Sequence, residues 1–240
     1  MSRFRPSLYL ILLAAVSLGG CGQAEKGKAQ VWVTRDRGAV VLDQGAVPGG
    51  LTALQGLDRL TKVETGYGGA FVTKIDGVAG SRLHQRDWFF FVNGYEADRG
   101  AASYRLRAGD VEWWDYRSWR GIERVPVAVG AFPEPFLHGY DGKRRVAAVR
   151  FGPGLSAEAH ALARVVGARS VAAIGRSVAP AANLLVVTTG RAGLVAQLRS
   201  GERAGEPVRF VVSGRAFARS LARNPALVRH RYQAPEWSSP

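Results

Sequence analysis

The 240-residue sequence contains a single cysteine, Cys21, near its N-terminus. One thiol excludes an intrachain disulfide and a cysteine-based zinc cluster, and it leaves no cysteine nucleophile in the rest of the chain. The histidines His84, His138, His160 and His230 stand apart from one another and form no recognised metal-ligand motif. These absences argue against a metal-dependent or thiol-based enzyme.

Other catalytic combinations are also missing. Residues 188–190 (Thr-Thr-Gly) and 213–214 (Ser-Gly) have no base at a recognisable spacing, so we predict strand ends and turns there. Residues 152–154 (Gly-Pro-Gly) precede a predicted helix, as a phosphate-binding loop does, but they lack the Lys-Ser/Thr pair and the proline removes a backbone donor. We therefore expect no enzymatic activity, no cofactor and no metal site.

The N-terminal apolar run is too short to cross a membrane. Residues 8–18 form a run of about 11 residues, whereas a spanning helix needs roughly 20. Arg3 and Arg5 precede this run, and Leu18-Gly19-Gly20-Cys21 follows it. This layout predicts a secretory signal peptide over residues 1–21.

Residues 18–21 resemble the bacterial lipobox, the site at which a diacylglyceryl group is attached to cysteine before cleavage. The resemblance implies export and a lipid anchor on Cys21, which would place the protein on the extracytoplasmic face of the cell membrane. Residues 22–29 are short and polar and are predicted to be a flexible tether. The alternative is a chance cysteine beside a signal peptide that is cleaved elsewhere.

The formal charge at pH 7 is +14, but the sequence has no polybasic block. Its 28 arginines and 5 lysines are spread along the chain. Such a charge is typical of a protein attracted to anionic lipid or wall polymer. A genome-wide coding preference for arginine would explain the same composition. We expect no nucleic-acid partner, because the sequence carries no recognition motif for one.

A change in composition divides the mature chain. Residues 30–124 are aromatic and strand-rich, whereas residues 146–240 are rich in Ala, Val and Arg, with Trp237 the only tryptophan after residue 120. Residues 125–145 include Phe132-Pro133-Glu134-Pro135-Phe136, whose prolines disfavour both a helix and a central strand. We predict two domains joined by this connector.

The first domain is predicted to be α+β. Alternating residues on either side of a turn predict a strand hairpin over residues 31–42. Thr52 and Gln55 form a capping box ahead of apolar residues at helical spacing, which predicts a helix over residues 52–62. Further strands are expected at residues 70–75, 88–92 and 110–119, with tight turns at Asp76-Gly77 and Asn93-Gly94.

The second domain is predicted to be a small α/β unit. Strands are expected at residues 146–151, 170–174, 183–189 and 207–213, and helices at residues 155–166, 192–200 and 216–223. Up to residue 213 this is the β-α-β-β-α-β order of a ferredoxin-like fold. We identify no family for this half.

Aromatic residues occupy both faces of two predicted strands, since side chains alternate along a strand. One face can be buried by the single helix; the other must meet the second domain, a partner or a ligand. Asp87 and Asn93 are assigned to a strand end and a turn, with ligand contact as the alternative. The predicted core aromatics are Trp88, Phe89, Phe91 and Trp113, and the candidate ligand-binding residues are Phe90, Trp114, Tyr116 and Trp119.

The segments at residues 69–77, 87–94, 100–106 and 109–111, followed by Trp119, together resemble the transcobalamin-like C-terminal domain. The resemblance implies a β-grasp-like fold and a non-enzymatic ligand binder, because this domain of transcobalamin and intrinsic factor closes over one face of a corrin ring. Phe90 falls where intrinsic factor has an apolar contact, and Trp119 where transcobalamin ends its last strand in tryptophan. The helical barrel that completes the vitamin site in those proteins is absent from this sequence.

Two hypotheses follow. The first is a lipid-anchored module that offers an aromatic face to a flat apolar ligand. The family resemblance suggests a corrinoid such as cobalamin as the ligand and a membrane transporter as the partner that receives it. The second is a non-enzymatic adaptor or structural lipoprotein of the cell envelope, whose aromatic face binds another protein.

Overall fold

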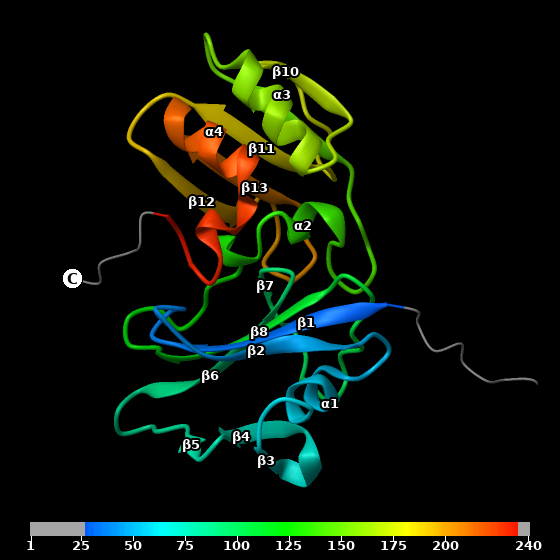
Figure 1. The fold of residues 1–240 in the computed structure, drawn as a ribbon, viewed down its shortest axis with the longest axis vertical. Coiled ribbons are helices and arrows are strands. Elements are labelled where there is room, and N and C mark those ends of the chain that lie inside the picture. The colour runs from blue at the N-terminus through cyan, green and yellow to red at the C-terminus, as the bar shows by residue number, and fades with distance from the viewer. Residues whose placement is uncertain (1–26, 235–240) are drawn as a thin grey trace, which may run out of the picture.

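A computed structural model describes residues 27–234, which form an α+β structure with one five-stranded sheet in each half of the chain (Figure 1). The signal peptide, Cys21 and most of the predicted tether lie outside these residues, but Lys28 and Ala29, the last two residues of the predicted tether, begin a strand instead. Among residues 27–234, no helix is both long and apolar enough to cross a membrane. The elements are β1 (Lys28–Arg35), β2 (Val40–Pro48), α1 (Ala53–Asp58), β3 (Val63–Gly66), η1 (Tyr67–Gly69), β4 (Phe71–Ile75), β5 (Val78–Ala79), β6 (Arg86–Val92), β7 (Tyr95–Glu96), β8 (Val111–Ser118), η2 (Val129–Ala131), α2 (Glu134–Leu137), β9 (Ala147–Phe151), α3 (Ser156–Val165), β10 (Ser170–Ala173), β11 (Asn183–Thr188), β12 (Gly193–Leu198), β13 (Val208–Ser213), α4 (Arg215–Arg223) and η3 (Pro225–Val228).

The first sheet has the strand order β2-β1-β8-β6-β7. Strands β1 and β2 form the predicted hairpin, and β1 pairs in parallel with β8 at the centre of the sheet. The predicted turn between β6 and β7 is also present, with Asn93 and Gly94 both at positive φ (51° and 84°). Two positive φ angles are required by the tight turn that matches strand twist, which explains the Asn-Gly pair.

Helix α1 begins with the predicted capping box. Thr52 Oγ1 accepts a hydrogen bond from the Gln55 N–H (3.1 Å), and Gln55 Oε1 accepts one from the Thr52 N–H (2.9 Å). The helix ends at Asp58, earlier than predicted, because the following residues turn the chain into β3. With the small sheet formed by β3, β4 and β5, α1 lies on the side of the first sheet away from the second half (Figure 1).

The second sheet has the order β10-β9-β11-β13-β12, and only β12 is antiparallel to its neighbour. The prediction of a helix over residues 192–200 is wrong, because residues 193–198 form β12. Along β12, Leu194, Ala196 and Leu198 are buried or half-buried, whereas Val195 and Gln197 between them are exposed. This alternation has the period of two that is typical of a strand, and β12 pairs with β13. The ferredoxin-like order is therefore not observed.

The connector is part of the core rather than an exposed linker. Residues 134–137 form the short helix α2, so the prediction that the prolines disfavour a helix here is also wrong. Pro135 lies in the first turn of α2, where the missing N–H costs no intrahelical hydrogen bond. Phe132 and Phe136 pack on Phe210 of β13, with ring centroids 6.0 and 5.2 Å apart.

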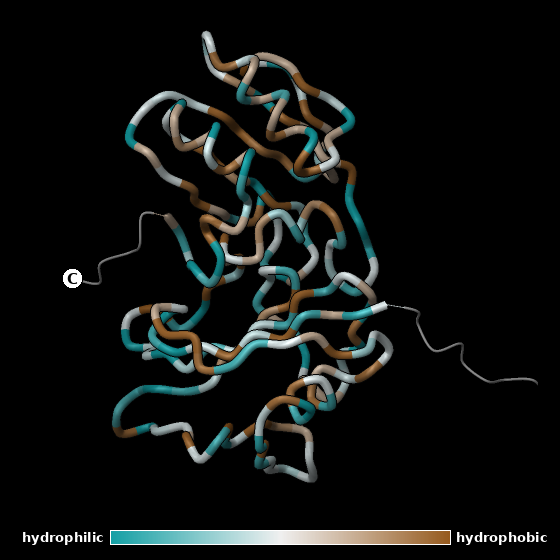
Figure 2. The backbone as a smooth tube through the Cα atoms, in the orientation of Figure 1, coloured by the Kyte–Doolittle hydropathy of each residue, from teal (hydrophilic) through white to brown (hydrophobic). Residues whose placement is uncertain are grey.

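Buried apolar side chains from both halves and from the connector form one contiguous cluster. Hydrophobic stretches run along the central strands of the second sheet, where α3 and α4 cover one face (Figure 2). The packing therefore joins two sheets of different composition through the connector.

Candidate functional site

Strands β6 and β8 carry the two predicted aromatic faces. They are antiparallel neighbours, with Phe90 opposite Trp114 and Phe91 opposite Trp113. Because side chains alternate, Phe90 and Trp114 lie on one face of the sheet and Phe91 and Trp113 on the other. The predicted division of the aromatics between two faces is confirmed.

The face that carries Phe91 and Trp113 is buried by the connector and by the C-terminal segment. The Tyr232 ring meets both aromatic rings edge-on, with centroid distances of 5.4 Å to Phe91 and 5.3 Å to Trp113. Ala128 and Ala131 of the connector complete this cluster. This aromatic face therefore meets the other half of the chain, one of the outcomes expected from the sequence.

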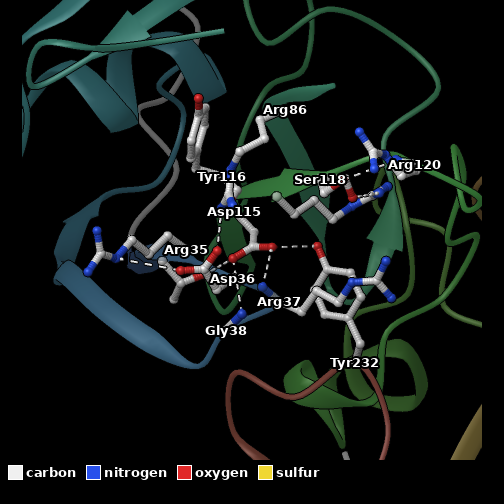
Figure 3. A network of polar contacts seen from close by, with 12 residues as sticks. Arg35, Asp36, Arg37, Gly38, Arg86, Asp115, Tyr116, Ser118, Arg120 and Tyr232 are labelled. Atoms are coloured by element: carbon white, nitrogen blue, oxygen red, sulfur yellow. Dashed lines mark hydrogen bonds and ion pairs between the residues drawn. The ribbon is translucent and has the colours of Figure 1, made fainter. Parts of the chain in front are cut away.

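Buried Asp115 ties the same face to the β1–β2 turn (Figure 3). Its Oδ1 accepts hydrogen bonds from Thr34 Oγ1 (2.6 Å) and the Gly38 N–H (3.0 Å). Its Oδ2 accepts one from the Tyr232 hydroxyl (2.9 Å). Burial raises the pKa of Asp115, and the hydrogen bonds from Thr34 and Tyr232 oppose that rise. The arrangement fastens the C-terminal segment to the first sheet and has the character of a structural network.

The other aromatic face opens into a cleft of about 450 Å³, on the side where α1 and the small sheet lie. Its floor includes Phe90 and Trp114, and Phe71 of β4 stands at its edge with 49% of its surface exposed. Among the described residues, none after position 114 lines the cleft. The lining residues are Ala70, Phe71, Val72, Asp87, Trp88, Phe89, Phe90, Glu96, Ala97, Asp98, Arg99, Gly100, Ala101 and Trp114.

Phe90 and Trp114 form a stacked pair at the base of the cleft, with centroids 4.9 Å apart and planes inclined by 16°. Phe90 is half-buried, whereas Trp114 is only 4% exposed. The Trp114 indole N–H donates to Glu112 Oε1 (2.6 Å), which fixes the ring. Burial raises the pKa of Glu112 well above its usual value, and the hydrogen bond from Trp114 opposes this rise. The floor is therefore a fixed aromatic pair, of which Phe90 is the more exposed ring.

Polar groups gather at the rim of the cleft. Glu96 accepts a hydrogen bond from the Val125 N–H (2.6 Å), and burial raises its pKa. Asp98 accepts hydrogen bonds from the Tyr140 hydroxyl (2.7 Å) and from Arg99 Nε (3.1 Å). Of the residues that the structure describes, no Ser, Thr, Cys, His or Lys lines the cleft. The chemistry available is stacking and hydrogen bonding at the edge, which suits non-covalent binding.

The four candidate ligand-binding residues are only partly brought together. Phe90 and Trp114 line the cleft, whereas Tyr116 and Trp119 do not. The Tyr116 hydroxyl donates to the Ala79 carbonyl (3.1 Å), and its ring is 5.2 Å from that of Trp88. Trp119 lies beyond the end of β8, where its backbone N–H donates to the Gln85 carbonyl (2.9 Å). Cys21 lies outside the described residues.

Three aromatic residues of the cleft, Phe71, Trp88 and Phe89, are not among the candidate ligand-binding residues that the sequence suggests. Trp88 is predicted to belong to the core, and it is indeed only 6% exposed, yet it also lines the cleft. Phe71 carries no signal of its own, although it lies in the strand predicted at residues 70–75 and in a segment that carries the family resemblance. The available clue is its position at the start of a short strand, just after Gly68 and Gly69, both of which have positive φ. Strand β4 lies in contact with β6.

Asn93 has the structural role expected from the sequence, not a ligand-binding one. Its amide donates to Asp110 Oδ1 (2.7 Å) and to the Gly139 carbonyl (2.9 Å), so it joins the turn to the connector.

One pair at helical spacing, Glu134 and His138, is not anticipated from the sequence, and its side chains are in contact on α2. Within residues 27–234, no three His, Cys, Asp or Glu side chains are grouped as metal ligands.

Residues 50–118 match the family model described as Domain of unknown function (DUF4430), a span that contains every residue lining the cleft. Among solved structures, the chain is similar to a protein from Ruminococcus gnavus ATCC 29149 to which a metal-binding role has been provisionally ascribed. The two share 16% sequence identity with a TM-score of 0.30, over 39% of this chain and 98% of that one. No curated protein matches the chain.

Proposed function

We propose that the protein is a lipid-anchored extracytoplasmic module that binds a flat apolar ligand in the aromatic cleft of its first half. The cleft itself carries the proposal, because it places Phe71, Phe90 and Trp114 around a space of about 450 Å³. Small-molecule sites typically have volumes of about 300–1,000 Å³ and are mainly apolar with a few polar groups. Stacking on the aromatic floor would supply affinity, and the rim would set orientation.

The fold and the family model support a more specific form of the proposal. The strand order β2-β1-β8-β6-β7, with β1 and β8 parallel and α1 on one side, is compatible with a β-grasp-like domain. The DUF4430 match is compatible with the transcobalamin-like C-terminal domain that the sequence resembles. These two observations make a corrinoid the first ligand to test.

Anchoring is the second part of the proposal, and it rests on the sequence around Cys21. A lipid there would hold the cleft near the membrane, where ligand could pass to a membrane transporter. A tethered module meets its partner at high effective concentration, so modest affinity would suffice. Replacing Cys21 with serine should abolish incorporation of labelled fatty acid and release the protein from the membrane fraction; labelling that persists would contradict the anchor.

Ligand binding is tested by calorimetric titration of the soluble mature chain with cobalamin. At roughly 100 µM ligand, sites of millimolar affinity or better begin to show. Phe71→Ala should weaken binding without unfolding the protein, because the side chain is 49% exposed. Trp119→Ala is the matched control, because it removes an aromatic outside the cleft. No heat with cobalamin or any related tetrapyrrole, or equal loss in both variants, would overturn the corrinoid proposal.

An envelope adaptor is the second candidate, and exposed aromatics beside the cleft favour it. Tyr67 is 84% exposed and meets Phe71 edge-on with ring centroids 6.3 Å apart. Exposed aromatic side chains of this kind are enriched where proteins bind one another. Site-specific cross-linking from position 67 in cells separates the candidates, since an adaptor should yield one discrete protein adduct and a small-molecule binder should not.

A further inference from the structure

The net positive charge is concentrated in the second half of the chain. Residues 30–124 contain 13 basic and 12 acidic residues, whereas residues 146–240 contain 13 arginines and 4 acidic residues. The second half therefore carries +9 of the total formal charge of +14. The basic character belongs to the second half, and the groove considered next shares no lining residue with the aromatic cleft.

A groove of about 600 Å³ lies between α3 and α4, the two helices that lie together on one face of the second sheet (Figure 1). Its apolar lining comes from small side chains, Ala157, Ala161 and Val165 of α3 and Ala222 of α4. Residues 157–165 extend about 12 Å along the helix at a rise of ~1.5 Å per residue. The groove is thus long, shallow and lined by methyl groups.

Charge is distributed unevenly along this groove. At the first turns of the helices, Glu158 Oε1 accepts from Arg215 (3.2 Å) and Arg219 (2.8 Å). The Glu158 side chain is 1% exposed, and its Oε2 has no hydrogen-bond partner among the described residues. A hydrogen bond from its own backbone N–H and then the bond from Arg219 lower the pKa of Glu158, so this end holds a carboxylate.

The opposite end of the groove carries two guanidinium groups without a carboxylate. Arg164 lies in the last turn of α3 and Arg223 at the end of α4, and both line the groove. Within residues 27–234, neither side chain forms a hydrogen bond or an ion pair. Guanidinium groups pair with carboxylate or phosphate in a planar, two-bonded geometry. An anion is therefore favoured at this end, where no carboxylate competes for the two guanidinium groups.

We propose that the α3–α4 groove binds a single-chain anionic amphiphile, with its head group on Arg164 and Arg223 and its apolar chain along the alanine-lined floor. Because guanidinium groups without an acidic partner stand only at this end of the groove, they select a ligand with one charged head group rather than an acidic helix with charges along its length. The volume of the groove lies within the range of about 300–1,000 Å³ that small-molecule sites occupy. This ligand differs in class and in location from the ligand of the aromatic cleft.

The test is calorimetric titration of the soluble mature chain with dodecyl phosphate, below its critical micelle concentration. We expect saturable one-to-one binding, weakened at least tenfold in the double variant Arg164→Ala/Arg223→Ala. The control Arg169→Ala/Arg191→Ala removes the same charge from exposed positions outside the groove and should bind normally. Equal loss in both double variants would show a general charge effect and overturn the proposal.

Two further experiments separate the contribution of the ligand's apolar chain from that of its head group. Ala161→Trp fills the half-exposed floor without changing charge and should abolish binding, with an unchanged circular dichroism spectrum showing that the protein remains folded. Inorganic phosphate alone and the neutral dodecanol should each bind at least tenfold more weakly than dodecyl phosphate. Phosphate binding as tight as dodecyl phosphate, or normal binding by Ala161→Trp, would rule out an amphiphile in this groove.

Discussion

The two halves of the molecule bury charge in different ways. The first sheet encloses Asp110, Glu112, Asp115 and Arg117, each 2% exposed or less. The second half has a mainly aliphatic core, and the buried Glu158 of α3 is paired with two exposed arginine side chains. Polar groups in a protein interior stabilise only when they are paired, so the first half depends on specific contacts and the second on apolar packing. This comparison makes the following predictions, from the largest effect to the smallest.

Arg117→Met should be the most damaging change. Arg117 is fully buried, lies 3.6 Å from the Phe89 ring centroid, and donates to the carbonyls of Ile122 (2.9 Å) and Glu123 (3.0 Å). Removing one partner of a buried charged arrangement costs about 3–5 kcal/mol. Urea denaturation should show a loss of this size in the free energy of unfolding.

Arg150→Met is the matched change in the second half. Arg150 is 7% exposed and donates to the carbonyls of Val149 (2.8 Å) and Arg176 (3.0 Å), with no ion pair within the described part of the chain. We expect a loss of about 1–3 kcal/mol, the range for unsatisfied hydrogen-bonding groups. A loss equal to that of Arg117→Met would break the comparison between the halves.

Tyr232→Phe tests the link between the C-terminal segment and the first sheet. The change removes the hydroxyl that donates to Asp115 Oδ2 (2.9 Å) and keeps the ring packed on Trp113. A hydrogen bond to a charged group contributes about 1.5–3 kcal/mol, so the free energy of unfolding should fall by that amount. Tyr67→Phe, at an 84% exposed tyrosine, should change nothing measurable.

Glu112→Gln should stabilise the protein, increasingly as pH rises. The pKa of Glu112 is raised by burial, so the unfolded chain loses this proton at lower pH than the folded protein does. Its contribution is fully present below about pH 4.5 and is lost as pH rises towards the folded pKa. Each unit of elevation corresponds to about 1.4 kcal/mol. Urea midpoints from pH 4 to 9 should diverge between variant and wild type; parallel curves would contradict the assignment.

Thr52→Ala should have the smallest effect. It removes the side-chain acceptor of the capping box on α1, a change that typically costs about 1 kcal/mol. Helices α3 and α4 have no side-chain N-cap, so neither α-helix that lies on the second sheet offers an equivalent site. Thr189→Ala, at an exposed threonine of the second half, is the control and should alter the melting temperature by less than Thr52→Ala does.

Local patterns predict the first half more accurately than the second. The capping box at Thr52 and the Asn93-Gly94 turn act over two to four residues and occur where expected. The helix predicted over residues 192–200 is a strand because a short apolar segment fits either element, and pairing with β13 decides in favour of the strand. The prolines of the connector mislead because Pro135 is tolerated in the first turn of a helix, and that tolerance cannot be recognised until the start of the helix is known.

The candidate site is predictable only in part for a similar reason. Alternation along residues 88–92 and 111–118 separates Phe90 from Phe91 and Trp114 from Trp113, and this pattern alone selects two residues that line the cleft. The contribution of Phe71 depends on the packing of β4 beside β6, and the exclusion of Trp119 depends on where β8 ends. Neither can be read from the neighbouring residues in the chain.

The sequence by itself determined what depends on neighbours in the chain: the lipobox-like segment ending at Cys21, the hairpin, the helix cap, the tight turns and the two aromatic faces. Only the tertiary structure decided which face is buried by Tyr232 and which opens into a cleft, and how the arginines of α3 and α4 are paired. The physical reason is range. Capping and alternation are set by bonded neighbours, whereas burial and ion pairing depend on residues that are far apart in sequence and meet only when the sheets pack.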